Sequence, residues 1–183
     1  MKRHLLKLAV IFGVLALAAQ AQALVITPTT DSPLTGTETS QSDIDDAIAS
    51  TLGSSTELYK QDVGGSESGS LAGSYQTTFF NTALDPSDAL IEYVGGDIVG
   101  PTAFLLIKDG NQDPAWYLFN LTDLGWTGVE DLSLEGFWPN RGAISHVALY
   151  GGTSTTVPEP GTLLLLGSGL VGLALFGRKS FKR

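Results

Sequence analysis

The chain has 183 residues and a formal net charge of −9, which leaves room for one domain of about 100–200 residues once terminal segments are set aside. It contains no cysteine, so disulfides, thiolate metal sites and cysteine nucleophiles are excluded. Residues 24–157 hold 18 acidic residues against Lys60, Lys108 and Arg141, a formal charge of −15. Such a polyanion repels phosphate groups, which disfavours nucleic acid and anionic lipid as partners.

Residues 1–23 have the three parts of a secretory signal peptide. Three basic residues stand within the first seven positions, an apolar run covers 8–19, and Ala21 and Ala23 form an A-x-A site. We expect signal peptidase to cleave after Ala23. The alternative is an uncleaved anchor, although the run is shorter than the ~20 residues of a usual span.

Residues 24–55 are rich in Thr, Ser and Asp, and we expect an extended leader with one short helix. Ser42 would begin the helix in a capping-box-like arrangement with the acid three positions later. Ile44, Ile48 and Leu52 then recur on one helical face.

Residues 56–152 change to short runs of β-forming residues separated by turn residues, with 153–157 as a linker. This spacing predicts an all-β domain, a β-sandwich or jelly-roll-like fold. The expected strands cover residues 56–63, 70–80, 89–94, 103–108, 115–121, 132–137 and 143–150.

The run at 115–121 has bulky side chains on both of its faces. Trp116 and Leu118 lie on one face, and Tyr117 and Phe119 on the other. Because period-2 alternation separates the two faces of a strand, this pattern predicts a strand buried on both sides, with Trp116 in the core.

A loop following residue 108 has a limited likeness to a calcium site. Asp109, Asn111 and Asp113 place side-chain oxygens at alternate positions, as an EF-hand loop does at its start. However, Pro114 stands where that loop needs glycine, and no glutamate follows at the twelfth position. A β-turn explains the same residues, so we expect no cofactor and keep calcium as the alternative.

Two tryptophans are candidates for a sugar-binding platform. Trp126 lies between glycines and Trp138 precedes a proline, so each could expose an aromatic face to a sugar ring, although aromatics near strand ends also cap cores. No catalytic constellation is evident. His146 is the one histidine after signal cleavage and its neighbour Ser145 would point to the other face of the strand, so we expect no enzyme.

The C-terminal segment, residues 158–183, combines three features. A Pro158-Glu159-Pro160 motif is followed by an apolar stretch that predicts a transmembrane helix at about 162–177. A basic tail at 178–183 would keep the C-terminus cytoplasmic and leave residues 24–157 outside. The anchoring residues are Arg178, Lys179, Lys182 and Arg183.

This order of motif, helix and basic cluster behind a signal peptide resembles the PEP-CTERM sorting signal of bacterial exosortase substrates. The resemblance implies recognition by a membrane-embedded exosortase, removal of the tail near the motif, and delivery to the surface or an exopolysaccharide matrix. The alternative is a permanent single-span anchor. Residues 108–119 and 142–151 also resemble the exported domains that often precede this tail, which implies a compact β fold and no catalytic residues.

We therefore expect an inner-membrane precursor that reaches the cell surface or extracellular matrix. The leading hypothesis is a structural or adhesive protein associated with exopolysaccharide. The alternatives are a lectin-like carbohydrate-binding module, with or without calcium, and a small extracellular hydrolase. The sequence does not specify the ligand, the glycan or the oligomeric state.

Overall fold

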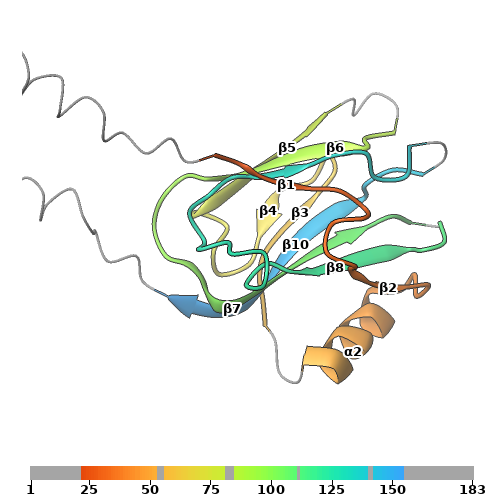
Figure 1. Cartoon of the computed structure of the whole chain (residues 1–183), viewed down its shortest axis with the longest axis horizontal. Helices are drawn as coiled ribbons and strands as arrows, with labels where there is room; N and C mark the ends of the chain where they lie inside the picture. Colours follow the sequence, from red (N-terminus) through yellow and green to blue (C-terminus); the bar gives the residue numbers. More distant parts are fainter. Residues whose placement is uncertain (1–21, 53–55, 81–84, 111, 140–141, 155–183) are drawn as a thin grey trace, which may run out of the picture.

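The computed structural model describes residues 22–52, 56–80, 85–110, 112–139 and 142–154. These residues form one helix and a set of strands in two sheets (Figure 1). The elements are β1 (Leu24–Ile26), β2 (Leu34–Gly36), α2 (Gln41–Leu52), β3 (Thr56–Asp62), β4 (Glu67–Ser68), β5 (Tyr75–Phe80), β6 (Asp88–Tyr93), β7 (Ile98–Lys108), β8 (Trp116–Asn120), β9 (Leu132–Leu134) and β10 (His146–Ser154).

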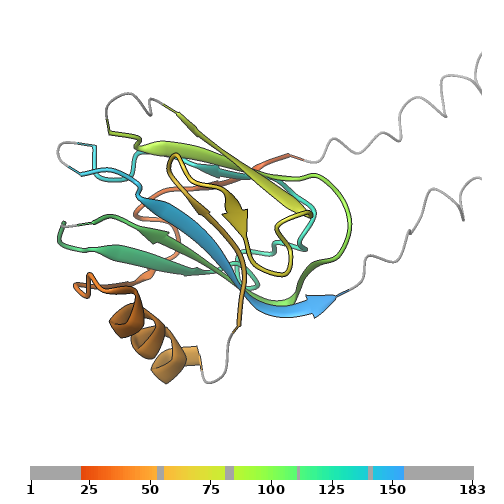
Figure 2. The same cartoon turned by 180° about the vertical axis from the view of Figure 1, so that it is seen from behind.

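The two sheets face one another, and α2 covers the outer side of the larger one (Figures 1 and 2). The strand order is β1-β9-β6-β5 in the four-stranded sheet and β2-β8-β7-β10-β3-β4 in the six-stranded sheet. All neighbouring strands pair antiparallel except β1 and β9, which are parallel. The predicted all-β fold is thus confirmed, whereas the predicted signal peptide and tail helix lie outside the described residues.

The main core fills the space between the sheets. Ile91 and Leu132 contribute from the smaller sheet, and Leu105, Phe119 and Val147 from the larger one, each at most 1% exposed. Alternation along each strand sends these side chains to one face. The Tyr75 hydroxyl joins the core to its loops, because it donates to the Gly128 carbonyl at 2.9 Å and accepts from the Val99 N–H at 3.1 Å.

A second core lies between α2 and the outer face of the six-stranded sheet. Ile44 and Ile48, one helical turn apart, are 0% and 1% exposed and pack with Trp116, Leu118 and Leu106. Strand β8 is therefore buried on both faces, as its sequence predicts. The Trp116 indole Nε1 also donates to Glu38 Oε2 at 3.1 Å.

Two features of the segment at 24–55 differ from the sequence analysis. Strand β1 pairs with β9 and β2 pairs with β8, so both sheets recruit this segment and the β structure begins at Leu24. The helix cap is Ser40, whose Oγ accepts from the Asp43 N–H at 3.3 Å. A strand of three residues is too short to show an alternating pattern, so it cannot be recognised from the sequence before its pairing partner is known.

All seven expected strands are present, with shifted ends. Strand β7 starts at Ile98, earlier than expected, and β10 continues to Ser154 through a register shift after Gly151. An added Cβ at Gly151 would lie 2.3 Å from the Thr102 carbonyl oxygen, so a glycine is required at this close approach.

The second core predicts the stability effect of removing one buried side chain. Ile48→Ala should lower the free energy of unfolding by about 2–5 kcal/mol, because it leaves a cavity beneath α2. Asp46→Ala changes an exposed position on the same helix and should have an effect within about 0.5 kcal/mol. Urea denaturation of residues 24–157 measures both, and equal losses would contradict the packing of α2 on the sheet.

Candidate functional site

The predicted processing sites lie at the edges of the described structure. Ala23 is exposed and directly precedes β1, whereas Ala21 lies outside the described residues. The motif Pro158-Glu159-Pro160 and the anchoring residues Arg178, Lys179, Lys182 and Arg183 lie outside them as well. Within the described ranges, no helix combines the length and apolarity needed to cross a bilayer.

The loop considered for calcium is organised by one buried carboxylate. Asp109 is 4% exposed and accepts hydrogen bonds from the backbone N–H of Gln112, at 3.2 Å, and of Ala143. Asp113 is exposed, and Asn111 is outside the described residues. Asp109 thus braces its own turn against the segment before β10. Among the residues with described positions, no group of three His, Cys, Asp or Glu side chains could hold a metal.

Both candidate platform tryptophans are buried, which corrects the expectation of exposed rings. Trp126 is 7% exposed, packs beside Tyr75 and donates from Nε1 to the Glu130 carbonyl at 2.7 Å. Trp138 is 8% exposed, lies 5.2 Å from the Tyr117 ring and donates to the Pro114 carbonyl at 2.9 Å. Both indole rings pack in the main core, so neither offers a face to a sugar.

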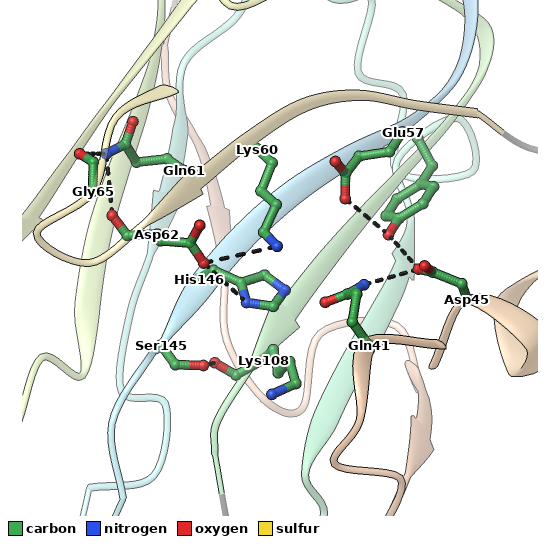
Figure 3. Close-up of polar contacts among 11 residues, drawn as sticks. Gln41, Asp45, Glu57, Lys60, Gln61, Asp62, Gly65, Lys108, Ser145 and His146 are labelled. Carbon is green, nitrogen blue, oxygen red and sulfur yellow. Dashed lines mark hydrogen bonds and ion pairs between the residues drawn. The ribbon is translucent and has the colours of Figure 1, made fainter. Parts of the chain in front are cut away.

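A polar cluster occupies the outer face of the six-stranded sheet, beside the area that α2 covers (Figure 3). Strand register places His146 of β10 opposite Lys108 of β7 and opposite Asp62 of β3. Lys60 lies opposite Ala148, one same-face position further along. The sheet therefore brings two of the three cations of residues 24–157 to one histidine.

His146 is the buried centre of this cluster. Its side chain is 6% exposed, and Nδ1 lies 3.6 Å from Asp62 Oδ1. Burial lowers the pKa of His146 to about 3, with further lowering from the positive charges of Lys60 and Lys108. The imidazole is therefore neutral at pH 7. Its Nε2 is buried and has no hydrogen-bond partner among the described residues.

A second polar group lies between the sheet and α2. The buried Tyr150 hydroxyl is 3.4 Å from both Asp45 Oδ1 and Glu57 Oε2, and Gln41 Nε2 donates to Asp45 at 2.8 Å. Burial, together with the two carboxylates, raises the pKa of Tyr150. Burial also raises the pKa of Glu57. This group fastens α2 to strands β10 and β3, and Figure 3 shows Asp45 and Glu57 beside the His146 cluster.

Sequence reasoning assigned His146 to a strand and missed its neighbours. Lys60, Asp62 and Lys108 are far from it along the chain, and only the pairing of β3, β10 and β7 brings them together. One sequence feature could have drawn attention to these lysines: residues 24–157 contain just three basic side chains. His146 and Tyr150 lie on the same outward face of β10, whereas Ile144 belongs to the main core.

The Asp109 brace predicts a difference between two neighbouring carboxylates. Asp109→Ala leaves two backbone N–H groups without their partner and should reduce stability by about 1–3 kcal/mol for each one that stays buried. Asp113→Ala removes an exposed side chain and should change stability by less than about 0.5 kcal/mol. Thermal unfolding of both variants tests this, and a neutral Asp109→Ala would contradict the bracing role.

The buried imidazole predicts a pH dependence of stability. The folded protein holds His146 near pKa 3, below its ordinary value of 6.5, so the unfolded chain binds the proton more readily. The contribution is fully present above about pH 6.5 and is lost progressively as pH falls toward about 3. Between pH 6.5 and 4, the wild-type free energy of unfolding should fall more steeply than that of His146→Gln. Parallel curves would contradict a neutral buried histidine.

Comparison with protein families identifies a PEP-CTERM protein-sorting motif at residues 156–179. No curated protein and no solved structure matches the chain. The matched residues include Pro158, Glu159 and Pro160 and extend through the predicted helix to Lys179. The predicted family resemblance of the tail is therefore confirmed: the chain carries the C-terminal sorting signal of exported proteins that exosortases process.

Proposed function

We propose that this chain is a non-catalytic surface or matrix protein, sorted by an exosortase, whose β domain associates with the exopolysaccharide of its own cell. The observation that carries the proposal is the sorting motif at 156–179 behind an acidic all-β domain. Signal peptidase would act first after Ala23. The inner membrane would hold the precursor through the tail helix until exosortase acts.

The arrangement of the chain ends supports surface display. The start of β1 and the end of β10 lie at the same end of the sandwich in both views (Figures 1 and 2). A domain attached at one end leaves its opposite end, and the outer sheet surfaces that α2 does not cover, open to partners. This geometry supports the proposed structural or adhesive role.

A lectin-like carbohydrate-binding module is the second candidate. The observation that favours it is the polar cluster of Lys60, Lys108 and His146 on the outer sheet face. Because Trp126 and Trp138 are buried, such a module would recognise sugars through charge and hydrogen bonds and not through aromatic stacking.

The sorting proposal predicts the form of the mature protein. Pro158 and Pro160 prevent a regular helix and keep the motif extended, as a processing enzyme requires. If exosortase removes the tail near this motif, the protein recovered from the surface should lack residues beyond about 160. Glu159→Ala should leave unprocessed precursor in the inner membrane, as should loss of the basic cluster at 178–183, which fixes the helix in the bilayer.

Intact mass analysis of surface and membrane fractions measures this processing. Glu135→Ala is the matched control, because it removes an exposed glutamate from the folded domain and should leave processing unchanged. A surface product that still carries residues 163–183 would refute processing and leave a simple membrane anchor.

A further inference from the structure

The outer face of the six-stranded sheet gathers two of the few basic side chains of a strongly acidic domain. Residues 24–157 carry 18 acidic residues and three basic ones. Two of those three, Lys60 and Lys108, lie on either side of the His146 imidazole (Figure 3). Both lysines lower the pKa of that imidazole through their charge, so both ammonium groups are close enough to act on it.

Two carboxylates, Asp62 and Glu57, interact with Lys60 through their charges, but they do not occupy all of its donors. Lys60 Nζ is 3.8 Å from Asp62 Oδ1, and the Asp62 side chain is 54% exposed, so this ion pair stabilises the fold by only about 0–1 kcal/mol. Lys108 has no carboxylate within ion-pair distance in the described part of the chain. An ammonium group has three N–H donors, so each lysine can donate hydrogen bonds to a further anion.

His146 adds a different requirement to the site. Because Asp62 Oδ1 lies near Nδ1, the carboxylate favours the tautomer that carries the proton on Nδ1. The Nε2 atom is then a hydrogen-bond acceptor, and it is buried with no donor within the described structure. Leaving such an atom unsatisfied costs about 1–3 kcal/mol, so the site favours a ligand whose hydroxyl reaches the buried Nε2 once a flanking lysine side chain moves aside.

We propose that Lys60, Lys108 and His146 form a binding site for a uronate residue of an acidic polysaccharide. The sugar carboxylate pairs with the two ammonium groups, and a neighbouring hydroxyl satisfies His146 Nε2. Neutral sugars lack the anion, and sulfate lacks the hydroxyl. This inference rests on the proposed association with exopolysaccharide, for which it names the ligand class and the site.

The chain offers a direct spectroscopic test, because His4 and His146 are its only histidines. The full chain in neutral detergent is titrated with alginate oligosaccharides, which consist of uronates, while the ring Cε1–Hε1 signals are followed by NMR. We expect the His146 signal to shift with saturation and the His4 signal to stay unchanged. Neutral cello-oligosaccharides and inorganic sulfate are titrated in parallel: the neutral sugars should leave the His146 signal in place, and sulfate, which can pair with the lysines but brings no hydroxyl, should shift it less than uronates do.

Substitutions around the histidine should move the affinity in opposite directions. Lys60→Gln and Lys108→Gln should each weaken uronate binding by about fivefold, the value of one partly exposed ion pair, whereas Lys60→Arg and Lys108→Arg should retain it. Asp62→Asn removes the competing carboxylate and should strengthen binding. A purely structural role for the cluster gives no reason for this increase.

The possible results separate this site from the sorting proposal. No shift of the His146 signal with uronates, or equal affinity in Lys108→Gln and Lys108→Arg, would overturn the site. A shift with sulfate as large as with uronates would reduce it to an unselective anion site and overturn the uronate assignment. Binding is measured on purified protein, so it is independent of tail processing. If the tail is processed correctly but uronates do not bind, the uronate site is overturned and the sorting proposal stands.

Discussion

The pairing of β7 with β10 is the constraint on which the rest of the structure depends. Residues 105–107 and 147–149 are buried on both sides of these strands, against the smaller sheet on one side and toward α2 on the other. A shift of one residue would exchange the two faces of every side chain. In a chain without cysteine, this double burial fixes the register, and the same register places Lys108 beside His146.

The polar cluster is a consequence of where the second core ends. Leu106 and Ala148 are buried in that core, but the next outward positions on their strands are Lys108 and His146. On β3, the outward positions Lys60 and Asp62 continue the same row. The outer face thus changes from apolar to charged within two residues along each strand, which leaves a neutral, buried histidine beside two cations.

Periodicity predicted the parts of this fold that are long enough to carry a pattern. The helix was recognisable from Ile44 and Ile48, and the double burial of β8 from its bulky residues on both faces. Strands β1 and β2 were not, since three residues show no alternation and their sheets recruit them by long-range pairing. Trp126 was misjudged because flanking glycines predict a loop correctly but do not say whether the indole turns inward, as it does to reach Glu130.

Sorting and binding use separate parts of the chain, and this separation has a physical basis. The sorting signal needs an extended motif, an apolar helix and a basic end, none of which depends on the folded domain. The candidate binding site depends on strand register and on the scarcity of cations in a domain of formal charge −15. Because that net charge repels polyanions at long range, an acidic polysaccharide would be retained at Lys60 and Lys108 by short-range contacts. Its attachment should therefore strengthen as salt screens the repulsion, until the salt also weakens the two ion pairs.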